Sequence, residues 1–208
     1  MARRGVAEQT RLYRGRAEEL ATSLLAELAP PEARAGARRA LVVLIGLPGA
    51  GKSHFGRLLA ERLAVPVVST DVLRRRLFVA PSYTREETRT VFAVAHAMAR
   101  RLLVLDRTAI FDATNLRERD RRPLYALADE ARATAVLVRV TAPEAAIYGR
   151  LEQRRARQGA EDASEADERV YEMMRGRYEE PSRPYLVVDT TEELAPAVDR
   201  VIKRLEQR

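Results

Sequence analysis

The chain has 208 residues, of which 46% are apolar and 32% are charged, and its formal net charge is +7. This length and apolar content suit one folded domain, alone or with an appendage. Cysteine is absent, which excludes disulfides, thiol nucleophiles and thiolate metal sites. No apolar run is long enough to span a bilayer, and charged residues follow the first arginines where a signal peptide needs an apolar run, so we expect a cytoplasmic protein.

The positive charge comes almost entirely from arginine, because only two of the 37 basic residues, Lys52 and Lys203, are lysines. A basic protein attracts anionic ligands such as a nucleotide or a nucleic acid. A genome that prefers arginine codons explains the same composition, and the arginines form no continuous block. Aromatic residues are sparse, so no stacking platform for single-stranded nucleic acid is evident.

The first part of the chain, residues 7–28, is predicted to form one amphipathic helix, because its leucines recur at helical spacings. Two prolines at positions 30 and 31 end this helix, and residues 33–39 have the composition of a linker. We therefore expect an N-terminal segment, residues 1–39, ahead of a main domain, residues 40–208. The segment either packs on the main domain or is the remnant of a linker from a longer parent protein.

A strand, a glycine-rich turn and a helix are predicted between residues 41 and 63. The turn fits the phosphate-binding P-loop pattern and consists of Gly46, Leu47, Pro48, Gly49, Ala50, Gly51, Lys52 and Ser53. Glycines let such a backbone turn its N–H groups onto a phosphate without a Cβ clash. The ammonium of Lys52 suits the β- and γ-phosphates, and the hydroxyl of Ser53 suits Mg²⁺. His54 stands where many P-loops have a second Ser or Thr, and its backbone N–H remains able to bind a phosphate oxygen.

Strands and helices alternate through the rest of the chain. The expected strands cover residues 65–69, 108–112, 135–140 and 185–188. The expected helices cover residues 71–77, 84–105, 117–132 and 164–179. Two more helices are expected, one that begins at Pro143 and a last one that is capped by Thr191. Thr70 is a candidate cap of the first of these helices, and Thr84 with Glu87 has the spacing of a capping box. The alternation predicts an α/β fold: a three-layer P-loop sandwich with a five-stranded parallel sheet and helices on both faces.

Two aspartates follow predicted strands, at the sheet edge where ligands bind in such folds. Asp71 is able to take a proton from an attacking hydroxyl, and Arg74, three residues later on the same helical face, is able to hold a phosphate or the acceptor. Alternatively, Asp71 merely caps its helix. Asp112 closes an apolar strand as a Walker B acid does, which favours a place in a magnesium shell or a role in orienting Arg74 or the acceptor.

Several arginines lie in one densely charged stretch after residue 149. Arg150 and Arg154 are four residues apart and share one helical face. Guanidinium groups at such a place are able to clamp a triphosphate and neutralise charge in the transition state. The alternative is a solvated helix in which these arginines pair with Glu152.

These motifs together resemble the P-loop kinase family that includes the 5′-kinase domain of polynucleotide kinases and, more distantly, zeta-toxin-like and gluconate-kinase-like enzymes. The resemblance covers residues 41 to about 190 and rests on residues 46–53, on residues 69–71 with Arg74, on residues 112–115 with Arg122, and on Arg150 with Arg154 in a lid. Residues 162–167, 179–181 and 187–190 resemble a bacterial subgroup of such kinases.

The resemblance implies ATP- and Mg²⁺-dependent phosphorylation of a hydroxyl. Asp71 would be the general base, Arg74 its partner on the acceptor side, and Arg150 and Arg154 the lid arginines on the nucleotide phosphates. The family resemblance favours a nucleic-acid 5′-OH as acceptor, and a sugar, an antibiotic or another small metabolite is the alternative. A nucleotide-dependent switch or interaction module is a third possibility, which the Asp71–Arg74 pair disfavours.

Overall fold

A five-stranded, all-parallel sheet forms the centre of the protein, as the sequence predicts. The computed structural model describes residues 10, 12–13, 15–28, 39–158 and 164–207. The strand order is β2-β3-β1-β4-β5. The strands are β1 (Ala40–Ile45), β2 (Val67–Ser69), β3 (Ala109–Asp112), β4 (Thr134–Thr141) and β5 (Tyr185–Asp189).

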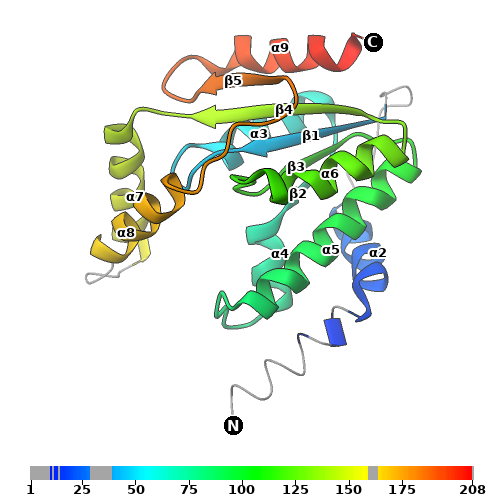
Figure 1. Cartoon of the computed structure of the whole chain (residues 1–208), viewed down its shortest axis with the longest axis horizontal. Helices are drawn as coiled ribbons and strands as arrows, with labels where there is room; N and C mark the ends of the chain where they lie inside the picture. Colours follow the sequence, from blue (N-terminus) through cyan, green and yellow to red (C-terminus); the bar gives the residue numbers. More distant parts are fainter. Residues whose placement is uncertain (1–9, 11, 14, 29–38, 159–163, 208) are drawn as a thin grey trace.

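Helices cover both faces of this sheet and make the three layers of the fold (Figure 1). Helices α3 (Lys52–Leu63) and α9 (Leu194–Glu206) pack on one face. The other face carries α5 (Arg85–Val104) and α6 (Glu118–Glu130), together with α2 (Ala17–Leu28) and α4 (Thr70–Leu77). Helices α7 (Glu144–Gln158) and α8 (Ser164–Arg175) stand beyond the carboxyl ends of the strands (Figure 1).

Strand β1 shows how the two faces are built from one sequence. All six of its residues are buried, and its side chains alternate between the two faces. Leu41, Val43 and Ile45 join the core under α5 and α6, whereas Val42 and Leu44 join the core under α3 and α9. A continuous apolar run is typical of a parallel strand covered on both sides.

Helix α2 packs on the main domain, which is one of the two possibilities that the sequence left open. Ala21, Leu24 and Leu25 are buried in the same core as the apolar residues of α5. Two exposed ion pairs flank this contact, Arg100 with Glu18 and Arg76 with Glu27. The remainder of the N-terminal prediction, residues 7–9, 11 and 14 of the helix and the linker before residue 39, lies outside the described residues.

Two predicted helix caps are wrong. Ser69 is the N-cap of α4, and Thr70 is its first residue, with a hydroxyl that donates to the backbone O of Asp112 at 3.4 Å. Helix α9 begins only at Leu194, after Glu193, because Thr191 closes the preceding turn by donating its N–H and hydroxyl to Asp189 Oδ1. Several boundaries also differ by one to four residues; for example, β2 begins at Val67, two residues later than predicted, and α8 ends at Arg175, four residues earlier than predicted.

Within the described parts of the chain, we find no helix whose length and apolar content would let it cross a membrane.

Candidate active site

The carboxyl ends of β1, β2 and β3 meet at one edge of the sheet and bring the predicted site segments together. Asp112, the last residue of β3, lies level with Ser69 of β2 and with Leu44 of β1. The P-loop leaves β1 just beyond this point, and Asp71 lies two residues beyond Ser69. The sheet register therefore explains why residues from three separate segments form one site.

Three glycines of the P-loop have no room for a side chain. A Cβ on Gly46 would lie 2.3 Å from the backbone O of Val140, and one on Gly49 would lie 2.9 Å from Cγ2 of Ile147. Gly49 and Gly51 also have φ angles of 78° and 90°, a backbone region that other residues rarely adopt. The glycine pattern read in the sequence is thus required both by backbone conformation and by packing against β4 and α7.

Lys52 lies among the other charged residues of the site. Its Nζ donates to the backbone O of Leu47 at 2.8 Å. Burial lowers the pKa of Lys52, the carboxylates of Asp112 and Asp71 act to raise it, and the positive charge of Arg154 lowers it further. Asp71, Asp112 and Arg154 therefore all belong to the electrostatic surroundings of Lys52.

Ser53 and Asp112 are joined directly. The Ser53 hydroxyl donates to Oδ2 of Asp112 at 2.7 Å, and the Asp112 residue is only 5% exposed. A hydroxyl and a carboxylate are hard oxygen donors of the kind that Mg²⁺ takes when phosphates and water complete its shell. No group of three or more acidic, histidine or cysteine side chains that could hold a metal occurs among the described residues.

His54 lies in the first turn of α3, where its backbone N–H already has a partner. Its side chain is exposed, and its N–H donates to the backbone O of Gly51 at 3.1 Å, within the first turn of α3. A phosphate contact from His54 therefore stays a prediction.

The two acceptor-side candidates differ sharply in exposure. Asp71 is exposed in the first turn of α4, where its carboxylate is free to meet a ligand. Arg74 is buried: its Nη1 donates to Oε1 of Glu87 at 2.5 Å, and its Nη2 donates to Oγ1 of Thr88 at 3.3 Å. Its guanidinium also lies 4.6 Å from the ring centre of Tyr83. A phosphate or an acceptor would therefore have to compete with Glu87 and Thr88 for the guanidinium of Arg74.

The sequence did not predict that Glu87 is the partner of Arg74. Its N–H donates to Oγ1 of Thr84, as the predicted capping box requires, but its carboxylate does not return to Thr84. Oε2 accepts instead from the N–H and the hydroxyl of Ser82, both at 2.7 Å. Burial acts to raise the pKa of Glu87, but the bonds from Ser82 and Arg74 outweigh it and lower the pKa, so the buried carboxylate is charged at neutral pH.

The two predicted lid arginines occupy different places. Arg150 lies against the P-loop from outside: its Nη1 donates to the backbone O of Gly49 at 3.2 Å and to Oγ1 of Thr190 at 2.7 Å. Its Nη2 donates to the backbone O of Thr190 at 3.0 Å. Arg154, one turn later in α7, is exposed. The sequence included Thr190 in the family resemblance over residues 187–190 but assigned it no role.

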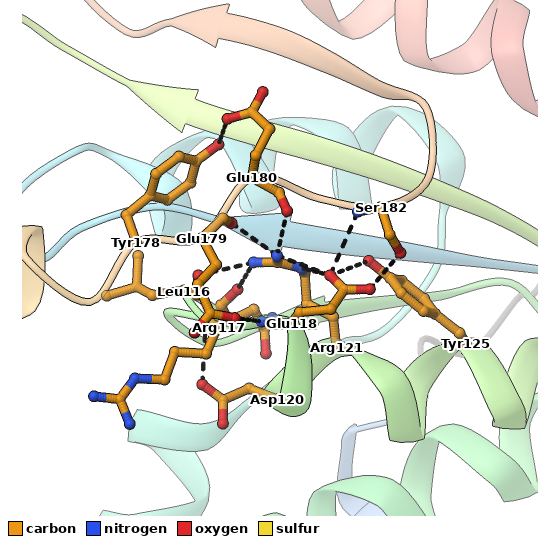
Figure 2. A network of polar contacts seen from close by, with 11 residues as sticks. Leu116, Arg117, Glu118, Asp120, Arg121, Tyr125, Tyr178, Glu179, Glu180 and Ser182 are labelled. Atoms are coloured by element: carbon orange, nitrogen blue, oxygen red, sulfur yellow. Dashed lines mark hydrogen bonds and ion pairs between the residues drawn. The ribbon is translucent and has the colours of Figure 1, made fainter.

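A buried arginine fixes the loop that returns from α8 to β5 (Figure 2). Arg121 is 0% exposed, and its guanidinium donates to the backbone O atoms of Asn115, Leu116, Glu179 and Glu180 and to the carboxylate of Glu118. The family resemblance singled out Arg122, which is exposed. The signal for Arg121 was its position on the same face of α6 as Leu124, Tyr125 and Ala128, which are buried.

Similar proteins support the fold. The family model of an AAA domain, AAA_33, matches residues 41–181. A shikimate kinase of Thermobifida fusca (strain YX) is 64% identical over 33 residues, which are 16% of this chain and only 19% of that protein. The chain thus matches about a fifth of the length of this curated relative.

Solved structures resemble the protein over most of its length. A candidate kinase from Chloroflexus aurantiacus J-10-fl has a TM-score of 0.67 and 22% identity, and the match covers 83% of this chain and 98% of that one. The APS kinase CysC of Mycobacterium tuberculosis, in complex with AMPPNP and APS, has a TM-score of 0.62, 19% identity and coverages of 82% and 99%. A gluconokinase from Sinorhizobium meliloti 1021 has a TM-score of 0.55, 19% identity and coverages of 81% and 92%. The fold is that of P-loop kinases, and the chain belongs to the AAA_33 family of AAA domains.

Proposed function

We propose that the protein is an ATP- and Mg²⁺-dependent kinase that transfers the γ-phosphoryl group to a hydroxyl of a small molecule. The observation that carries this proposal is the joint position of Lys52, the Ser53–Asp112 pair and the exposed carboxylate of Asp71 at one edge of the sheet. A protein that only binds a nucleotide has no need of a free carboxylate beside the phosphate site.

Each group has a role that its chemistry supports. The P-loop amides and Lys52 would hold the β- and γ-phosphates, and Ser53 with Asp112 would hold Mg²⁺, which neutralises phosphate charge when bound. Asp71 would accept the proton of the acceptor hydroxyl as its oxygen bonds to the γ-phosphorus. The bond from that phosphorus to the bridging oxygen of ADP breaks in the same step. Arg154 is exposed near Lys52 and would add positive charge on the nucleotide.

The buried ion pair of Arg74 with Glu87 favours a small acceptor over the 5′ end of a polynucleotide. A nucleic-acid 5′ end carries a phosphodiester close to its hydroxyl and needs a free cation there. Arg74 is the cation one turn from Asp71, and its charge is already matched by the buried carboxylate of Glu87. The names of the similar proteins, shikimate kinase, APS kinase and gluconokinase, support the same choice.

Transfer of labelled phosphate from ATP tests the proposal directly. Purified protein with Mg²⁺ is incubated separately with shikimate, gluconate, a panel of sugars and antibiotics, and an oligonucleotide with a free 5′-OH. We expect label on a small hydroxyl compound, with ADP formed in equal amount. Label on the oligonucleotide alone, with a steep dependence on salt, would establish the polynucleotide alternative. ATP hydrolysis without transfer to any acceptor would favour a switch protein.

Two variants separate binding from chemistry. Asp71→Asn should abolish transfer and leave the affinity for an ATP analogue within about twofold, because the carboxylate acts on the acceptor and not on the nucleotide. Lys52→Ala should weaken nucleotide binding and abolish transfer together. Full activity of Asp71→Asn would refute the assignment of the base.

A further inference from the structure

The backbone carbonyls of the P-loop need hydrogen-bond donors of their own. When the N–H groups of a loop converge on a phosphate, neighbouring carbonyls must point away from it, and buried carbonyls without partners are costly. The O of Leu47 receives the Ala50 N–H and Lys52 Nζ, and the O of Gly51 receives N–H groups of α3. These bonds are made within the motif and the helix that follows it.

The carbonyls of Gly49 and Ala50 receive donors from outside the motif. Arg150 Nη1 donates to the O of Gly49 at 3.2 Å, and the hydroxyl of Thr190 donates to the O of Ala50 at 2.9 Å. The Thr190 hydroxyl also accepts from Arg150 Nη1 at 2.7 Å. The two side chains are therefore connected to each other as well as to the loop.

Thr190 is itself held by the sheet. Its N–H donates to the backbone O of Thr141 at 2.9 Å, which extends the pairing of β4 with β5 by one residue. Its backbone O accepts from Arg150 Nη2 at 3.0 Å. The contact with the P-loop is also steric, because a Cβ on Gly51 would lie 2.9 Å from both Cγ2 and Oγ1 of Thr190.

Apolar contacts continue this support. Ala50 is buried in a small cluster with Ile147 and Leu151 of α7 and Tyr171 of α8. The outer side of the P-loop is thus packed against α7, α8 and the end of β5, and the polar contacts of Arg150 and Thr190 lie within this packed region.

We propose that Thr190 and Arg150 form a brace that sets the shape of the P-loop, and that both are positioning residues for nucleotide binding. The proposal rests on the proposed nucleotide site. It gives Arg150 a role different from that of an arginine on the transferring phosphate: Arg150 acts on the nucleotide through the carbonyls of Gly49 and Thr190. Arg154, which is exposed on α7 and acts electrostatically on Lys52, keeps its proposed role on the phosphates.

The affinity for a fluorescent ADP analogue, measured with Mg²⁺ on the full chain, tests the brace. Thr190→Val removes the hydroxyl but keeps the contact with Gly51, and should weaken binding about tenfold, as expected for one lost hydrogen bond to a buried carbonyl. Thr190→Ser keeps the hydroxyl and should bind within about twofold of wild type. Thr191→Val is the matched control, because within the described part of the chain Thr191 bonds to Asp189 and not to the P-loop.

A double-mutant cycle with Arg150→Met completes the test. Arg150 and Thr190 share one hydrogen bond and one loop, so the double variant should lose much less affinity than the product of the two single losses. Arg150→Met should also raise the KM for ATP by a larger factor than it lowers the rate of hydrolysis at saturating ATP, because a positioning residue acts on binding.

Other results would overturn the brace. Binding by Thr190→Val within twofold of wild type, or independent effects of the two substitutions, would refute it. A fall of a hundredfold or more in the saturated hydrolysis rate of Arg150→Met would instead establish a direct contact with the transferring phosphate. Failure of the wild-type protein to bind the ADP analogue at all would refute the proposed nucleotide site and the brace together, whereas normal binding without phosphoryl transfer would refute only the kinase proposal.

Discussion

The hydroxyl of Ser53 donates a 2.7 Å hydrogen bond to Oδ2 of Asp112, and this bond joins the first turn of α3 to the end of β3. If these two oxygens hold Mg²⁺, Asp112→Asn should lower the rate of magnesium-dependent ATP turnover by roughly a hundredfold or more. Calorimetric titration with ADP, with and without Mg²⁺, should show that the variant loses the gain in affinity that Mg²⁺ gives the wild type. An unchanged magnesium effect would exclude Asp112 from the metal site.

The buried pair of Arg74 and Glu87 should be a sensitive point for stability. Glu87→Ala leaves a buried guanidinium without its counter-charge and should lower the free energy of unfolding by about 3–5 kcal/mol in urea titrations. Glu18→Gln, which removes one partner of an exposed pair, is the control and should cost less than about 1 kcal/mol. Equal effects of the two substitutions would contradict the burial argument.

Arg121 and its neighbour Arg122 offer a matched comparison on one helix. Arg121→Met removes a donor from four backbone carbonyls, of which that of Leu116 still receives the Glu179 N–H, and should destabilise the protein by about 3 kcal/mol or more. Arg122 is exposed, so Arg122→Met should stay within about 0.5 kcal/mol of wild type. Hydrogen exchange should speed up in residues 179–182 of the Arg121 variant only, and protection there in both variants would show that Arg121 does not fix this loop.

His96 should make the fold sensitive to acid. Burial, and then the charge of Arg100, lower the pKa of His96 to about 4, and its ring stacks on Phe111 with centres 5.5 Å apart. Its ordinary pKa is 6.5, so between pH 6.5 and 4 the unfolded state binds the proton that the folded state does not. Stability therefore falls as the pH falls through this window, by about 3 kcal/mol at most from this group.

Substitution of each histidine isolates this effect, because the chain contains only two. His96→Phe should flatten the dependence of unfolding free energy on pH between 6.5 and 4, whereas His54→Gln, at an exposed position, should leave the wild-type slope. Identical slopes for the wild type and His96→Phe would mean that His96 is not neutral in the fold.

The sheet and the phosphate loop were predictable because their signals are local. The run from Leu41 to Ile45 followed by the Gly-Lys-Ser pattern determines a strand, a turn and a helix start, and four later apolar runs become the other strands of the sheet. The partners of charged side chains were not predictable in the same way. Glu87 has the spacing of a cap, but its carboxylate faces Arg74, thirteen residues earlier in the chain.

The contacts of two arginines were not predicted for the same reason, because each has partners that lie far away in the sequence. Arg121 and Arg122 are adjacent in the sequence, and only the packing of α6 decides which one is buried under the loop at Glu179. Arg150 lies against the P-loop, and its partner Thr190 is forty residues away and joins it only through the pairing of β5 with β4. Such pairs depend on the assembled fold, which no single segment encodes.

Helix α2 has a consequence for how the protein can be divided. Its buried residues, Ala21, Leu24 and Leu25, fill part of the core that α5 would otherwise expose to water. A fragment that starts at residue 40 would carry an uncovered apolar strip along α5 and would be prone to self-association. The smallest cooperative folding unit therefore begins upstream of the first strand, and a shortened version for crystallisation or fusion should retain the chain from at least residue 17.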